Sequence, residues 1–166
     1  MSDRSIRKFG MKRDALSYVI TTLWGLMVIG VVSYFVYTSS GTYLPAWISI
    51  LLGAIIVLVY LSAPRSVIVT RDNIEIHCVA DLTVIPRSEI KKIEPLSVKY
   101  LRGCVPLYAV WGVFGYYGYY LNLRNFRVFR MYASQRRNLV VIKYGEENKR
   151  VVVSVRRREE FLEFLS

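Results

Sequence analysis

The residues of this 166-residue chain that could support metal or nucleophile chemistry are few, and their spacing is wrong for it. His77 and Cys78 are adjacent, and Cys104 follows much later. Adjacent residues of a strand point to opposite faces of a sheet, so His77 and Cys78 would not cooperate. A structural zinc site needs four ligands, and three His and Cys residues cannot supply them. We predict no Cys–His pair and no metal site; without Cys-x-x-Cys spacing, two free thiols in a reducing cytoplasm are favoured.

The carboxylates form no acid–base pair that the sequence can identify. Glu146 and Glu147 fall in a predicted turn, and Glu159 and Glu160 fall in the first turn of a predicted terminal helix, where they favour its dipole. No Gly-x-Ser-x-Gly nucleophile motif is present. The sequence therefore predicts a protein that is not an enzyme and that needs no cofactor.

A glycine-spaced segment, Gly112-x-x-Gly115-x-x-Gly118, resembles a phosphate loop only superficially. It lacks the Gly-Lys-Ser/Thr ending that supplies a lysine and a metal-binding hydroxyl. Large rings surround the glycines, and we favour a strand edge where they permit bends or bulges. The alternative is an exposed loop over residues 110–117 that enters the bilayer interface or grips a partner. Its candidate aromatic contacts are Trp111, Phe114, Tyr116 and Tyr117.

The formal net charge of +11 is the strongest compositional signal for a partner. Cations beside an anionic membrane surface contribute on the order of 1 kcal/mol each, and a solvated basic surface is the plainer interpretation. No basic stripe on a recognition element is evident, so nucleic acid is not predicted as a partner. The candidate contacts to headgroups or to a partner are Lys91, Lys92, Arg102, Arg136 and Arg137.

Two charge-free apolar runs, residues 15–37 and 44–62, must position these groups. A bilayer core needs roughly 20 apolar residues of helix, so each run is long enough to cross it. The first run exceeds the apolar core of a signal peptide and a second follows at once, which disfavours cleavage. A soluble helical core is likewise disfavoured. Residues 15–62 are therefore predicted to form a transmembrane hairpin with a tight turn at 38–45.

Cations flank the hairpin but are missing from its loop, so the positive-inside rule places both flanks in the cytoplasm. Residues 1–14 then form a basic cytoplasmic N-terminus. No ionisable residue lies inside the runs, which favours an anchor over a transporter. Gly25, Gly30 and Gly53 are weak candidates for close helix approach.

Residues 63–166 change to the alternating pattern of strands. Strands are predicted at 66–70, 74–78, 82–85, 90–96, 115–121, 126–133, 139–144 and 150–155, with turns between them. The last eleven residues switch period, and Phe161, Leu162, Phe164 and Leu165 share one face of a predicted helix. The pattern indicates a small, mostly antiparallel β structure that this helix closes.

This region resembles the bacterial pleckstrin-homology-like (PH-like) membrane proteins. The resemblance rests on residues 112–120, 130–134 and 158–165, and on the segment 85–93 between early strands. It implies an α+β fold in which a seven-stranded, partly open barrel is capped by a C-terminal helix, and it implies no defined activity. Eukaryotic pleckstrin domains bind phosphoinositides through a basic motif between their first two strands. Here that turn is only Arg71-Asp72-Asn73, so this activity is not carried over.

The hypothesis that follows is a non-enzymatic interaction module in a bacterial cytoplasmic membrane, with both termini cytoplasmic. It would bind a protein partner, a second copy of itself or anionic lipid headgroups. The alternative is an accessory or regulatory subunit of a larger membrane complex, with the hairpin packed against other helices.

Overall fold

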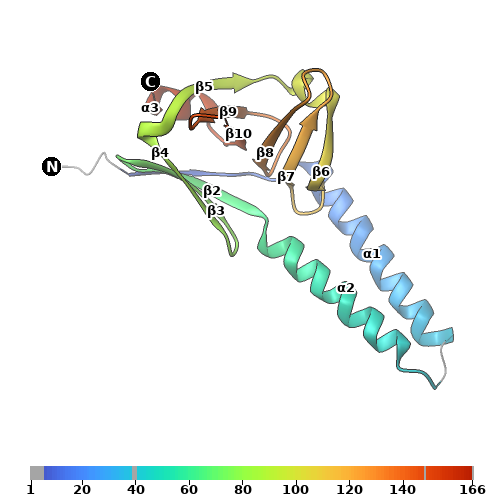
Figure 1. Cartoon of the computed structure of the whole chain (residues 1–166). Coiled ribbons are helices and arrows are strands. Elements are labelled where there is room, and N and C mark those ends of the chain that lie inside the picture. Colours follow the sequence, from blue (N-terminus) through green and yellow to red (C-terminus); the bar gives the residue numbers. More distant parts are fainter. Residues whose placement is uncertain (1–5, 39–40, 148, 166) are drawn as a thin grey trace.

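The computed structural model describes residues 6–38, 41–147 and 149–165. Part of the predicted basic N-terminus, residues 1–5, lies outside the described residues, as do residues 39–40 of the connecting loop, Asn148 and Ser166. Two long helices project from one side of a β domain (Figure 1). The domain consists of two sheets and a short C-terminal helix.

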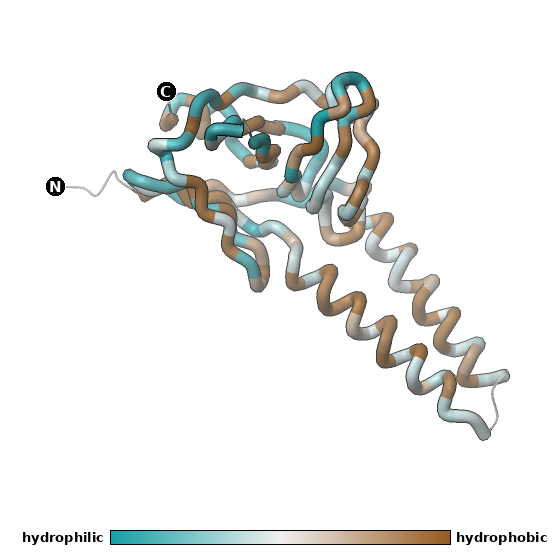
Figure 2. The backbone as a smooth tube through the Cα atoms, viewed as in Figure 1, coloured by the Kyte–Doolittle hydropathy of each residue, from teal (hydrophilic) through white to brown (hydrophobic). Residues whose placement is uncertain are grey.

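The two helices, α1 (Ala15–Thr38) and α2 (Leu44–Leu61), fit a transmembrane hairpin. At 1.5 Å per residue they measure roughly 36 and 27 Å, which matches a hydrocarbon core of about 30 Å. Apolar residues run along both helices (Figure 2), and only 6% of each most apolar window is buried, unlike a core helix of a soluble protein. An added Cβ at Gly25, Gly30 or Gly53 would meet nothing within 4 Å. The prediction that these glycines bring the two helices together is therefore wrong.

The first sheet has four antiparallel strands in the order β1-β2-β3-β4. They are β1 (Arg7–Gly10), β2 (Pro64–Val69), β3 (Asn73–Cys78) and β4 (Leu82–Pro86). β1 precedes the hairpin in the sequence and was not predicted, because four residues with one buried side chain, Phe9, are too short for a readable alternation. β1 pairs with β2, and Phe9 lies opposite Val67. The segments just before and just after the hairpin therefore lie side by side.

The second sheet has six strands in the order β5-β9-β10-β8-β7-β6. They are β5 (Ile90–Leu96), β6 (Cys104–Trp111), β7 (Tyr116–Asn122), β8 (Arg127–Ala133), β9 (Leu139–Tyr144) and β10 (Lys149–Ser154). β8 and β10 pair in parallel, and the other neighbours are antiparallel. The 3₁₀ helices η1 (Arg87–Glu89) and η2 (Val98–Gly103) flank β5. The partly open, helix-capped fold is confirmed, but the described residues 64–165 form nine strands instead of seven, and β6 is unpredicted, as is β1 before the hairpin.

Two apolar clusters stabilise the domain. The larger lies between the sheets and is closed by α3 (Arg158–Leu165), whose Phe161 is fully buried. The Phe161 ring meets that of Phe9 edge-on, with 5.0 Å between centroids. The smaller cluster covers the other face of the six-stranded sheet, where Tyr100 and Leu101 of η2 pack on it. Both β7 and β8 contribute buried side chains to each cluster, and this packing holds in place the strands that reach toward the hairpin.

Candidate functional site

The carboxylate of Asp14 ties the start of α1 to the β domain. Oδ1 of Asp14 accepts a hydrogen bond from the backbone N–H of Ser17 at 2.9 Å, which is an N-cap interaction. Its Oδ2 accepts from the backbone N–H of Arg136 at 3.3 Å, and its own N–H donates to the carbonyl of Ser134. The capping residue therefore also anchors the segment between β8 and β9.

The turn between β6 and β7 packs directly on the first turns of α1. The Ser17 hydroxyl donates to the carbonyl of Gly112 at 2.9 Å in a buried contact, and the Phe114 N–H donates to Oγ1 of Thr21 at 2.9 Å. Gly112 has a φ of +89°, and a Cβ there would lie 2.5 Å from Cδ1 of Ile20. Glycine is favoured at this position by its backbone conformation, and a Cβ would also require the Ile20 side chain to shift.

The end of α2 is joined to the same sheets. A helix leaves its last four carbonyls without partners inside the helix. Here the Tyr117 hydroxyl donates to the carbonyl of Val59, and the Ala80 N–H donates to the carbonyl of Leu61 at 2.9 Å. Strand β7 and the β3–β4 turn thus satisfy carbonyls of α2, and the helix ends on a fixed support.

Phe114 lies between the two helix ends. Its ring meets the Tyr60 ring of α2 edge-on at 5.4 Å, and the Arg13 guanidinium, just before α1, lies 5.5 Å from its centroid. We call the residues that make these joints the collar: Asp14, Ser17, Thr21, Val59, Tyr60, Leu61, Ala80, Gly112, Phe114, Tyr117 and Ser134. The collar holds both helix ends against one end of the domain.

Five cations adjoin the collar by contact or in sequence, and we call them the basic rim: Lys12, Arg13, Arg65, Arg136 and Arg137. Nη2 of Arg65 donates to the Tyr60 hydroxyl at 3.0 Å. The Arg136 guanidinium lies 5.7 Å from the Trp111 ring and 6.0 Å from the Tyr116 ring. Arg137 is exposed. The basic rim sits where a bilayer surface would meet the ends of the spanning helices.

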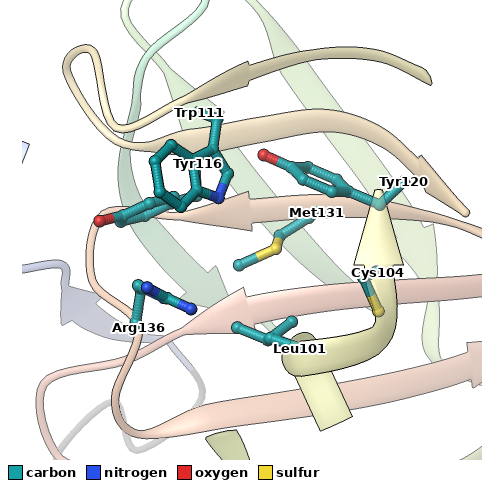
Figure 3. Close-up of a pocket in the computed structure, with 7 residues that line it drawn as sticks. All are labelled: Leu101, Cys104, Trp111, Tyr116, Tyr120, Met131 and Arg136. Carbon is teal, nitrogen blue, oxygen red and sulfur yellow. The ribbon is translucent and has the colours of Figure 1, made fainter. Parts of the chain in front are cut away.

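A small pocket lies beside Arg136 (Figure 3). It encloses about 20 Å³, which is room for a water molecule but not for a cofactor. Burial raises the pKa of Tyr116 to about 12, so its hydroxyl stays protonated at neutral pH. The pocket is lined by Leu101, Cys104, Trp111, Tyr116, Tyr120, Met131 and Arg136.

The model of one protein family, the bacterial PH domain, matches residues 65–166. The chain belongs to the bacterial PH domain family. It matches no curated protein and no solved structure. The match begins after the hairpin, so β1 and both spanning helices lie outside the part that the family model describes. PH-like domains are generally non-catalytic.

His77 and Cys78 occupy structural positions in this bacterial PH domain. Cys78 is buried and His77 faces the other way, where its Nε2 lies 2.9 Å from Oε2 of Glu75. Burial raises the pKa of the Cys78 thiol to about 11, which keeps it out of the reactive thiolate form. Within the described ranges, no three His, Cys, Asp or Glu side chains are grouped to hold a metal ion.

The structure separates the five predicted basic contacts into different places. Arg136 and Arg137 belong to the basic rim, whereas Lys91 and Lys92 lie on β5, at the end of the domain away from the helices (Figure 1). Nζ of Lys92 pairs with Oε1 of Glu94 at 2.6 Å. Arg102 precedes β6, an eight-residue strand of roughly 25 Å whose far end meets the collar. One flat bilayer surface at the collar would not meet all five.

The alternative of an exposed aromatic loop over residues 110–117 is wrong for two of its four rings. β6 and β7 extend into it and leave a turn of Gly112–Gly115, so Tyr116 and Tyr117 are strand residues that are 1% and 4% exposed. Trp111 is half exposed, and Phe114 contacts α1 and α2 instead of an external partner. Gly112 and Gly115 are bend positions with positive φ in this turn, whereas Gly118 lies within β7, a central strand and not a strand edge.

Gly118 allows β6 and β7 to approach closely. Its φ is +114°, and a Cβ would lie 2.4 Å from the Tyr108 carbonyl, beside the register shift between Pro106 and Tyr108.

Sequence reasoning missed Ser17 and Thr21 as site residues. The available signal was two hydroxyls one helical turn apart, at the start of an otherwise apolar run.

Proposed function

We propose that this protein is a non-enzymatic, membrane-anchored interaction module that contacts anionic lipid headgroups at the cytoplasmic face of a bacterial inner membrane. The single observation that supports this proposal is the collar, which keeps the basic rim at the ends of two spanning helices. The charge-free loop and the cationic flanks of the hairpin support the cytoplasmic orientation of both termini.

The attraction of cations to an anionic membrane surface is additive and short-ranged. Each cation near an anionic surface contributes on the order of 1 kcal/mol, and the attraction falls off within a Debye length of about 8–10 Å. Rim cations satisfy this distance limit by their position, and distal cations such as Lys91 and Arg102 do not. The rim should therefore give the protein a preference for anionic lipid in its immediate shell.

The test compares charge reversal at the rim with charge reversal at the distal end, in the full chain. The rim variant is K12E/R137E, and the matched control is K91E/R102E; all four side chains are exposed. The unfolding temperature is measured in nanodiscs of phosphatidylcholine, with and without a quarter of phosphatidylglycerol. We expect phosphatidylglycerol to stabilise the unmodified protein and the control, but not the rim variant. An equal loss in both variants, or none in either, would refute the proposal.

A second candidate function is an accessory or regulatory subunit of a larger membrane assembly, or a homo-oligomer. The observation that favours it is the uncovered surface of the hairpin, including the open space around Gly25 and Gly30. Small residues permit close helix approach in membranes. Crosslinking and mass spectrometry in native membranes should then give a stoichiometric partner that G30L loses and T22L retains. A partner that survives G30L would count against this packing surface.

A further inference from the structure

A second hollow lies next to the collar, between the last turn of α2 and the faces of β6, β7 and β8. It encloses about 480 Å³, within the usual range of 300–1,000 Å³ for small-ligand sites. We call it the helix-end groove, and its lining residues are Leu58, Val59, Ser62, Asp81, Leu107, Tyr108, Ala109, Val110, Tyr117, Gly118, Tyr119, Arg130 and Tyr132. It is separate from the small pocket beside Arg136.

The groove walls carry one cation and one anion, Arg130 and Asp81. Nη2 of Arg130 lies 3.6 Å from Oδ2 of Asp81, which is an ion pair but longer than a hydrogen bond. The guanidinium lies 4.8 Å from the Tyr132 ring and 5.6 Å from the Tyr119 ring, and those rings orient it. Tyr132 is itself fixed by a 2.7 Å hydrogen bond with Thr83.

The charged pair keeps donors and acceptors for a ligand. The Arg130 side chain is 36% exposed and that of Asp81 is 56% exposed. A guanidinium has five N–H donors and a carboxylate about four acceptor positions. The long Arg130 contact, and the hydrogen bond that Oδ1 of Asp81 accepts from the Leu82 N–H at 2.9 Å, therefore leave several of these positions free. The pair can therefore bind a group that carries an anion and an ammonium side by side.

Apart from Ser62 and the tyrosine hydroxyls, the rest of the groove is apolar, and it borders the last turn of α2. Leu58, on the last turn of α2, is 64% exposed, and the β6 residues Leu107 and Tyr108 are 56% and 85% exposed. A soluble surface seldom keeps such neighbours uncovered. An acyl chain that follows α2 out of the bilayer would cover them, and its headgroup would reach the charged pair.

We propose that the helix-end groove binds one aminophospholipid of the surrounding membrane, with its phosphate on Arg130 and its ammonium on Asp81. Charge complementarity selects this occupant. A phosphatidylglycerol headgroup offers no cation to Asp81, and the quaternary ammonium of phosphatidylcholine cannot donate a hydrogen bond to it. The inference does not depend on the basic rim, because neither Arg130 nor Asp81 belongs to it.

The test adds lipids to the full chain after it has been purified and delipidated in a neutral detergent. Phosphatidylethanolamine, phosphatidylglycerol and phosphatidylcholine with identical acyl chains are titrated, and bound lipids are counted by native mass spectrometry. We expect one phosphatidylethanolamine to bind about tenfold more tightly than the other two, since charge-assisted hydrogen bonds are the stronger class. Soluble glycerophosphoethanolamine, which has no acyl chains, should compete poorly.

Two variants test which residue binds the phosphate and which binds the ammonium of the headgroup. R130Q should abolish the tight site, and D81N should retain lipid but remove the preference for phosphatidylethanolamine over phosphatidylcholine. R127Q is the matched control, on the same strand but outside the groove. Should R130Q unfold, L58W fills the groove from α2 without changing charge and should also displace the lipid.

Three results would overturn the inference: equal binding of the three lipids, an unchanged preference in D81N, or equal competition by the soluble headgroup. The rim experiment can fail while this one succeeds. The rim experiment measures the dependence of stability on phosphatidylglycerol through Lys12 and Arg137, and neither residue belongs to the groove.

Discussion

Removal of the Asp14 carboxylate should loosen both the start of α1 and the β8–β9 segment. In D14A the helix loses its N-cap bond from Ser17 N–H, which costs about 1 kcal/mol. The half-buried Arg136 N–H loses its acceptor as well, which costs about 1 kcal/mol more. For a chain of this size, a total of about 2 kcal/mol lowers the unfolding temperature by roughly 4–8 °C.

The assay is thermal unfolding of the full chain in detergent micelles, combined with amide hydrogen exchange. Exchange should accelerate at Ser17 and at Arg136 together in D14A, because one carboxylate serves both amides. D14N retains a good capping side chain and should lose less than half as much stability. D72A is the control, since Asp72 is an exposed turn aspartate. An unchanged D14A, or acceleration at Ser17 but not at Arg136, would refute the double role.

Three further perturbations test other parts of the structure. G112A should destabilise the protein by more than G145A, measured by thermal unfolding: both glycines have positive φ, but only a Cβ at 112 would press on α1, whereas the nearest atom to one at 145 is 3.9 Å away. F161A should cost about 3–5 kcal/mol in denaturant unfolding, because the fully buried ring closes the main cluster, whereas F164A on the partly buried side should cost less. Hydrogen bonds from lysines hold the folded-state pKa of Glu94 at about 2, below its ordinary 4.5, so its stabilisation is present above pH 4.5 and disappears as the pH falls toward 2. The difference in unfolding temperature between the unmodified chain and E94Q should therefore shrink over that pH range, and a constant difference would contradict this assignment.

The hairpin and most strands were predictable because their signals are local. Charge-free runs identify α1 and α2, and alternation identifies strands such as β3, where Ile74, Ile76 and Cys78 are buried in turn. β6 was missed because it is the edge of its sheet, and its largely exposed residues give no alternation. β1 was missed because its partner is β2, on the other side of the hairpin.

The candidate site was less predictable, because it consists of contacts between residues that are far apart in sequence. Ser17 meets Gly112, and Val59 meets Tyr117. Neither pair follows from spacing along one element. The composition of residues 110–117 correctly drew attention to this segment, but it could not show that Tyr116 and Tyr117 point into two different apolar clusters.

The pairing of β1 with β2 has consequences for how the domain acts at a membrane. These strands flank the hairpin, so their pairing requires both helix ends to emerge on the same side. Only four residues separate β1 from α1 and two separate α2 from β2, and the collar bonds both junctions. The domain is therefore not a tethered body that must find the bilayer by diffusion. Its collar end is already oriented, so a lipid contact there does not incur the translational and rotational cost of association. The opposite end, with β5 and α3, lies away from the two helices (Figure 1), so a protein partner outside the bilayer could reach it.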